Sequence, residues 1–240
     1  MREFRADLHI HTCLSPCAGL EMSPKQIVSE AKRKGLHVIG ICDHNSAENV
    51  PAVMQTGAKA GLHVIGGMEV TSREEVHILA LFGENESLFA LQKAVYDHLY
   101  GSNDEGRYGD QVIVNGDEEV LGYSDKLLIG ATDIDIDRLV GIIHEFGGLA
   151  IAAHVDREGF GIIGQLGFIP PALPLDALEV ADPSARDTIP GRDRYAFVTG
   201  SDAHTIDRVG TRCSRFWMED VSIGEMRRCF LGIDGRRVDM

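Results

Sequence analysis

The sequence Gly35-Leu36-His37-Val38-Ile39-Gly40 recurs further along the chain as Gly61-Leu62-His63-Val64-Ile65-Gly66. The distance between the two copies is that of one helix plus one strand, so the repeat predicts a βαβ unit with parallel strands. An acid follows each copy after three residues, Asp43 in the first case and Glu69 in the second. Chemistry in parallel α/β folds and barrels lies at the carboxyl ends of the strands, where these two acids are expected.

The first predicted strand carries the motif Asp7-Leu8-His9-Ile10-His11-Thr12. Side chains two residues apart share one face of a strand, so Asp7, His9 and His11 are expected to point one way and Leu8 and Ile10 the other. Two imidazoles and a carboxylate at one strand end are half of a metal site.

Further potential ligands stand at the ends of later strands. The predicted strand 76–82 follows its predecessor so closely that an antiparallel pairing is expected, which brings His77 back toward Glu69. The strand from 149 ends in His154, and the strand from 195 runs into Asp202 and His204. The complete set is His9, His11, His44, Glu69, His77, His154, Asp202 and His204. It exceeds what one ion needs, so it predicts two or three divalent ions of Zn, Mn or Fe.

Composition restricts the class of protein. The chain has 240 residues, a length that favours a single domain that spans residues 1–240. The 23 basic and 37 acidic residues give a net charge of −14, which argues against stable binding to nucleic acid or to an anionic membrane. No apolar run approaches the roughly 20 residues of a membrane span, and the N-terminus lacks the core of a signal peptide. The five irregularly spaced cysteines do not form a disulfide framework. A cytoplasmic protein is therefore expected.

Residues 84–131 interrupt the alternation of strands and helices. A predicted helix over 86–100 is followed by a glycine-containing loop and by a hairpin between 111 and 129. We expect this segment to be an insertion, and it could serve either as a lid over the site or as solvated decoration.

The motifs Asp7–Thr12 and Asp202-Ala203-His204, together with Asp43-His44, Glu69, His77 and His154 between them, resemble those of the PHP (polymerase and histidinol phosphatase) family. This resemblance covers nearly the whole chain outside 84–131. It implies an α/β fold, a distorted (β/α)7 barrel with a trinuclear metal site open at the carboxyl-end face.

The resemblance also implies which residues bind each ion. One ion would take His9, His11, Glu69 and Asp202, and a second would share Glu69 and add His77 and His154. A third would take His44, His204 and one residue of the loop after the first motif. Family members often have a histidine there, whereas this chain has Cys17. A thiolate binds Zn or Fe well, so the third site either bears a thiolate or is weak or empty.

The expected activity is hydrolysis of a small phosphate ester by a metal-activated water. Asp7 and Asp43 are expected to orient histidines, and Asp43 is also a candidate proton carrier. Arg157 and, less specifically, Arg73 are candidates to bind the phosphate. His44 or His204 could protonate the leaving group if the third ion is absent. The expected partner is a small phosphorylated substrate.

Two other functions remain open. One is a nuclease acting on oligonucleotide ends, which the net charge disfavours. The other is a metal-binding regulatory module without catalysis, which the nearly complete ligand set disfavours.

Overall fold

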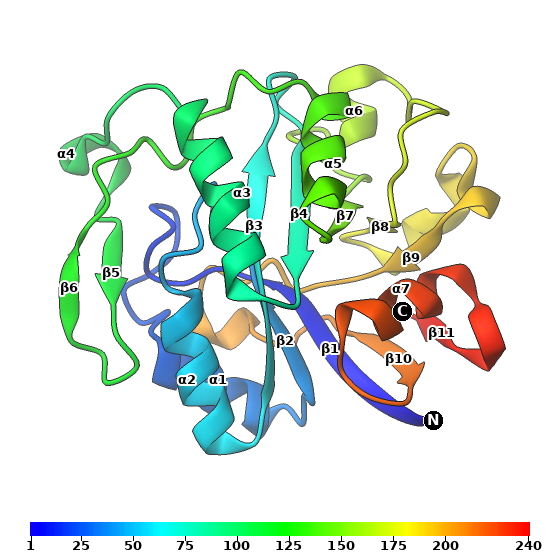
Figure 1. Cartoon of the computed structure of the whole chain (residues 1–240), viewed down its shortest axis with the longest axis horizontal. Coiled ribbons are helices and arrows are strands. Elements are labelled where there is room, and N and C mark those ends of the chain that lie inside the picture. Colours follow the sequence, from blue (N-terminus) through cyan, green and yellow to red (C-terminus); the bar gives the residue numbers. More distant parts are fainter.

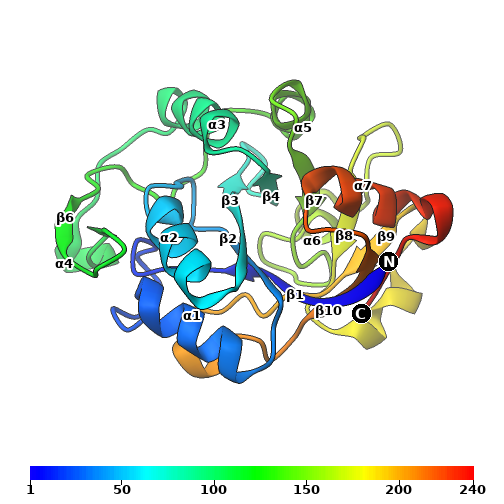
Figure 2. The same ribbon diagram turned by 60° about the horizontal axis from the view of Figure 1, so that its bottom comes forward.

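The computed structural model of the protein describes residues 1–240 and shows nine strands curled into a nearly closed barrel (Figures 1 and 2). The strands of this sheet are β1 (Arg2–Ile10), β2 (Val38–Ile41), β3 (His63–Thr71), β4 (His77–Phe82), β7 (Leu149–Ala152), β8 (Ala177–Glu179), β9 (Ala196–Val198), β10 (Ser214–Met218) and β11 (Arg237–Asp239). Their order is β11-β10-β1-β2-β3-β4-β7-β8-β9.

The helices surround this curved sheet (Figure 2). They are α1 (Pro24–Arg33), α2 (Val50–Ala60), α3 (Asn85–Asp97), α4 (Glu105–Tyr108), α5 (Ile136–Glu145), α6 (Ile162–Leu166) and α7 (Ile223–Leu231). The predicted α/β class and distorted barrel are confirmed. None of the helices has both the length and the apolar character needed to cross a bilayer.

Strand directions agree with the predicted βαβ unit. β2 and β3 are parallel and are joined by α2, which ends at Gly61 in the left-handed conformation (φ 66°) that glycine adopts without strain. β4 is antiparallel to β3, and His77 is the residue opposite Thr71, so the expected return of His77 is confirmed. Only β4 and β10 run against the other strands of the barrel.

A bulge in β1 changes which side chains face the barrel interior. The register between β1 and β2 shifts between Asp7 and Ile10. Leu8 consequently packs in the apolar interior of the barrel, whereas Ile10 packs in the outer layer between the sheet and the helices. The expectation that Leu8 and Ile10 share one face is therefore wrong, because a bulge re-aims the side chains around it.

Two apolar layers hold the barrel together. The outer layer packs α1, α2, α3 and α5 against the sheet, and the inner layer is completed by Ile223, Met226 and Cys229 of α7. A cavity of about 440 Å³ lies at the seam where β9 and β11 meet, and it is lined by none of the predicted metal ligands.

The segment predicted as an insertion has two parts with different environments. α3 buries Leu88, Leu91 and Val95 against the sheet, so it is part of the core. β5 (Val112–Val114) and β6 (Val120–Tyr123) form a separate ribbon at the side of the barrel (Figure 1). The segment then returns to the barrel, because the Asn45 side-chain amide donates to the carbonyls of Leu128 and Gly130 at 2.8 Å each. The boundaries 84–131 stay a prediction.

Gly40 allows β1 and β2 to approach closely, and its substitution tests this packing. A methyl group at Gly40 would lie 2.5 Å from the carbonyl oxygen of Leu8. We expect Gly40→Ala to lower the free energy of unfolding by about 1–3 kcal/mol in urea titrations followed by circular dichroism. The control Gly141→Ala in α5 meets no atom within 4 Å and should stabilise by up to about 1 kcal/mol. Equal stability of the two variants would contradict this assignment.

Candidate metal centre

The carboxylate of Glu69, fully buried in β3, lies among the side chains of five histidines. One or the other of its oxygens is within hydrogen-bonding range of a ring nitrogen of each. The distances are 3.3 Å to His9, 3.5 Å to His11, 3.1 Å to His44, 2.8 Å to His77 and 3.1 Å to His154. One end of the barrel therefore holds all six side chains, which come from the ends of β1, β2, β3, β4 and β7.

The first group of ligand atoms consists of His9, His11 and Asp202 beside Glu69. His9 Nε2 and His11 Nε2 are 3.2 Å apart, and they lie 3.4 and 3.2 Å from Asp202 Oδ1. Ligand atoms that share one tetrahedral ion, with bonds of about 2.0–2.1 Å, are about 3.3 Å from one another. This geometry fits a divalent ion, and it is the group that the resemblance implied for the first ion.

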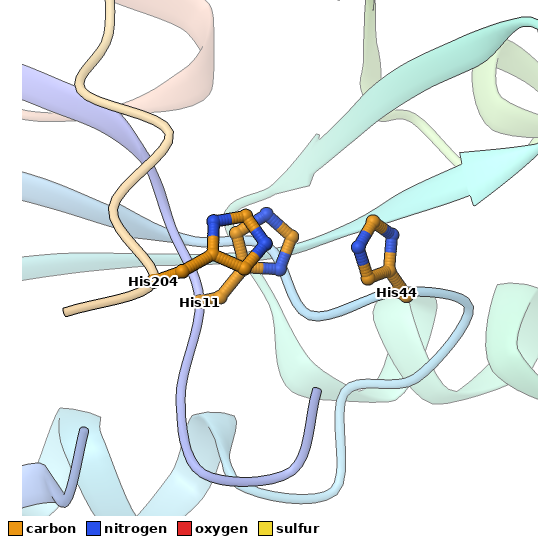
Figure 3. Close-up of side chains that lie close together, drawn as sticks. All are labelled: His11, His44 and His204. Atoms are coloured by element: carbon orange, nitrogen blue, oxygen red, sulfur yellow. The ribbon is translucent and has the colours of Figure 1, made fainter. Parts of the chain in front are cut away.

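Two further groups lie beside the first. His44, Glu69 and His77 have ligand atoms within 4.8 Å of one another, and so do His11, His44 and His204. The rings of His11 and His204 are stacked, with centroids 4.0 Å apart, and the ring of His44 lies next to them (Figure 3). His44 thus belongs to both groups, whereas the resemblance implied that it binds the third ion alone.

Two buried nitrogen atoms show that the centre is incomplete without a cation. Nδ1 of His154 is buried and has no hydrogen-bond partner, and the buried Nδ1 of His77 lies 2.8 Å from Glu69 Oε1 without the angle of a hydrogen bond. Buried polar atoms without a partner are rare because their desolvation is not compensated. The residues present therefore fit divalent ions, for which nitrogen and carboxylate ligands are suitable.

The charges of the centre also favour cations. Burial alone would raise the pKa values of Glu69 and Asp202, but the neighbouring histidines hold the pKa of both carboxyls well below the usual range. Burial, together with the positive charge of neighbouring histidines, lowers the pKa of His11. The carboxylates are thus negative and His11 is neutral, which are the forms that bind metal ions. Burial would lower the pKa of His9, but the negative charges of Glu179, Glu69 and Asp202 outweigh burial and raise this pKa, so His9 would release a proton when it binds an ion.

The backbone is strained at several of these positions. Asn45, His154 and Asp202 have φ values of 51°, 27° and 50°. Residues other than glycine seldom adopt this left-handed region, and such strain is typical of functional sites.

Asp43 lies behind the metal centre. It is fully buried, accepts hydrogen bonds from Thr12 N and Thr12 Oγ1 at 2.7 Å each, and accepts one from Ser15 Oγ at 2.6 Å. Ser15 Oγ in turn lies 2.9 Å from His11 Nδ1. The placement corresponds to the orienting role expected for Asp43. It does not support the proton-carrying role, because Asp43 does not line the cavity at the centre.

Glu179, at the carboxyl end of β8, is a residue of the centre that the sequence analysis missed. Its Oε2 lies 2.9 Å from His9 Nδ1 and accepts a hydrogen bond from His154 N at 3.1 Å. It is buried, so it fixes the orientation of His9 and leaves His9 Nε2 directed at the ligand group. Glu179 was missed because β8 has only three residues and carries no motif. Its position at the end of a strand is nevertheless the same signal that identified the other ligands.

A cavity of about 200 Å³ opens onto the centre, and it is lined by His44, Glu69, His77, Ile129, His154, Arg157, Gly159, Phe160, Asp202 and His204. Arg157 is half-buried, and its Nη1 donates to Asp202 Oδ2 at 2.6 Å. Arg73, the other candidate cation, is exposed and lies near Glu74 and Asp135. The structure therefore brings Arg157 to the centre and leaves Arg73 on the surface.

Cys17 lies at the exposed rim, beside His44 and His204. Partial desolvation raises the pKa of its thiol, but hydrogen bonding to His204 and His44 outweighs this and lowers the pKa to about 7. Burial would lower the pKa of His44, whereas hydrogen bonding to Cys17 and Glu69 raises it to about 10. The thiol is therefore close to the form that binds metal ions.

We expect Glu179→Gln to weaken metal binding about 10–100-fold, because an amide orients His9 less firmly than a carboxylate does. The affinity for Zn²⁺ would be measured by competition with a chelator, with circular dichroism to verify the fold. The control Glu105→Gln changes an exposed acid of α4 and should leave the affinity unchanged. Unaltered affinity in a folded Glu179→Gln protein would contradict the role of Glu179.

Solved structures with a similar fold include two of endonuclease Q. The lesion-specific endonuclease from Pyrococcus furiosus has a TM-score of 0.76 and 21% identity, over 99% of this chain and 58% of the endonuclease. An endonuclease Q complex with a 27-mer duplex that carries an abasic lesion at the active site has a TM-score of 0.74 and 21% identity, over 98% and 58%. This chain thus spans less than two thirds of the length of these two proteins.

A third similar structure comes from Bifidobacterium adolescentis, and its protein is assigned as a metal-dependent phosphoesterase. Its TM-score is 0.57 and its identity is 19%, over 83% of this chain and 87% of that protein.

These comparisons correct the expected partner. The fold of this chain matches a protein that was solved on a DNA duplex. The expectation of a small phosphorylated substrate without stable nucleic-acid binding is therefore wrong. The physical reason is that net charge sums the whole surface, whereas binding depends on the charges near the site and on the cations held there.

The sequence itself matches one family model. No curated protein matches the chain, but the model described as the PHP domain matches residues 7–160. This range holds the first motif together with His44, Glu69, His77 and His154 of the metal centre. The chain belongs to the PHP domain family.

Proposed function

We propose that this chain is a metal-dependent nuclease that hydrolyses a phosphodiester of a nucleic-acid strand. The observation that carries the proposal is the convergence of five histidines on the buried carboxylate of Glu69, beside Asp202 and under an open cavity. The similarity to endonuclease Q supports nucleic acid as the substrate.

The size of the cavity favours a polymer over an enclosed small molecule. Sites that enclose small ligands have volumes of about 300–1,000 Å³, whereas this cavity has about 200 Å³ and must also contain the ions. It therefore holds a phosphate group, and the rest of the substrate extends beyond its rim, as a strand does.

When bound, the ions would neutralise phosphoryl oxygens and make a water nucleophilic near neutral pH. His9, His11, Glu69 and Asp202 would hold one ion, and His77 and His154 would hold a second that shares Glu69. Arg157, fixed by Asp202, presents a planar cation that suits a phosphate oxygen. It would orient the phosphodiester toward the centre.

In the protein without a third ion, His204 is the candidate to give a proton to the leaving oxygen. Its side chain is 27% exposed, more than any other member of the set. Its Nδ1 donates to the backbone carbonyl of Asp202 at 3.0 Å, which leaves Nε2 free for a third ion or, when that ion is absent, for the proton transfer.

The test is cleavage of end-labelled single-stranded and duplex oligonucleotides with Mn²⁺ or Zn²⁺. We expect chelation to abolish cleavage, and Glu69→Gln to reduce it by about 100-fold or more because the shared ligand is weakened. Glu105→Gln is the matched control and should cleave like the unaltered protein. Hydrolysis of phosphomonoesters without cleavage of any oligonucleotide would exclude the nuclease.

We further propose that Cys17 is the third ligand of an ion at His44 and His204. Metal content measured by mass spectrometry on anaerobically purified protein should fall by about one ion per chain in Cys17→Ala and be retained in Cys17→His. Cys213→Ala, a partly buried cysteine elsewhere, is the control. If Cys17→Ala keeps the full metal content, Cys17 is not a ligand.

A further inference from the structure

Phe160 places an exposed aromatic ring at the mouth of the metal centre. The ring lines the cavity, is 42% exposed, and lies nearly parallel to the imidazole of His77, with centroids 4.4 Å apart and an angle of 19° between the planes. The stacked imidazole covers one face of the ring. The exposed part of the ring is therefore available to another planar group.

The backbone fixes Phe160 in an unfavourable conformation. Its φ is 60°, a region that bulky residues seldom adopt. Its carbonyl accepts a hydrogen bond from His77 N at 2.9 Å, which ties the loop to the start of β4. The next residue is also tightly packed, since a methyl group at Gly161 would lie 2.5 Å from the Arg157 carbonyl oxygen. The contacts around this loop therefore hold the backbone of Phe160 in a strained conformation and fix the position of its ring.

The lining of the cavity divides into a polar interior and a small apolar part. Phe160 and Ile129 are the two apolar residues among its ten lining residues, and Ile129 is 38% exposed. Ile129 comes from the segment that Asn45 holds at the barrel through Leu128 and Gly130. The polar interior suits a phosphate and metal ions, whereas an exposed aromatic ring suits the flat face of a nucleobase.

We propose that Phe160 is a stacking platform for the nucleobase next to the scissile phosphate, with Ile129 as a second apolar contact. This inference rests on the proposed nuclease function and makes Phe160 a specificity-determining residue. It predicts that the protein favours a nucleotide that carries a base at this position over one that lacks it. Base–aromatic stacking in single-strand binding changes affinity by about tenfold or more per base.

The first test compares cleavage of two oligonucleotides, one with all its bases and one with a tetrahydrofuran abasic analogue beside the cleaved linkage. The unaltered protein should cleave the complete strand with a kcat/KM about tenfold higher. Phe160→Leu should bring this ratio close to one, and Phe160→Trp should keep it. Phe168→Leu is the matched control, because Phe168 is 55% exposed and does not line the cavity.

Metal content separates stacking from a structural role. If Phe160 only shields His77, then Phe160→Leu loses metal and both oligonucleotides are cleaved more slowly by the same factor. That result would overturn the inference. A ratio that is unchanged in Phe160→Leu would overturn it as well.

A binding measurement separates this inference from the proposed function. An oligonucleotide with 2-aminopurine beside a cleavage-resistant phosphorothioate linkage should lose fluorescence on binding to the unaltered and Phe168→Leu proteins, but not to Phe160→Leu. Quenching without cleavage of any ordinary oligonucleotide would sustain the platform and refute the nuclease. Fluorescence that does not change with the unaltered protein would refute the platform.

Discussion

The structure depends on one constraint: a buried carboxylate on β3 that five imidazoles approach from four other strands. Glu69 has almost no contact with solvent, and each neighbouring ring must bring a nitrogen atom to the same point. A barrel of strands provides this, because strands that run in one direction end on one face. The arrangement concentrates polar atoms that the protein alone does not satisfy, as the Nδ1 atoms of His77 and His154, which lack a hydrogen bond, show. Bound cations would compensate for that desolvation, so folding and metal binding are thermodynamically coupled.

Much of the fold could be predicted because it follows from periodic patterns. The repeated Gly-Leu-His-Val-Ile-Gly predicts two parallel strands, and a short connection predicts the reversal that returns His77 to Glu69. The directions of the side chains of β1 could not be predicted, because strict alternation fails at a bulge. The sequence Asp-Leu-His-Ile-His contains no residue that indicates a bulge. Glu179 could not be predicted for a related reason. Its strand has only three residues, which is too short for a pattern that would mark the last residue as part of the site.

The roles of single residues depend on tertiary contacts, which the sequence alone does not give. Asp43 and Glu69 occupy equivalent places after the two copies of the repeat, yet Glu69 enters the centre and Asp43 is held behind it by Thr12 and Ser15. The net charge of −14 also led to a wrong expectation about nucleic-acid binding, because it gives equal weight to every acid of the chain. Two of those acids, Glu69 and Asp202, lie inside the centre, where bound cations would reverse the local potential.

The position of the N-terminus has a consequence for how the barrel can be joined to other molecules. β1 begins next to the N-terminus and delivers its histidines at its other end (Figure 2). The N-terminus therefore lies at the end of the barrel away from the metal centre, whereas β11 runs in the same direction as β1 and directs the C-terminus toward the side of the centre. A fusion partner, an affinity tag or a surface attachment at the N-terminus would leave the mouth of the cavity unobstructed. The barrel can thus be immobilised through its N-terminus with its metal centre facing the solution.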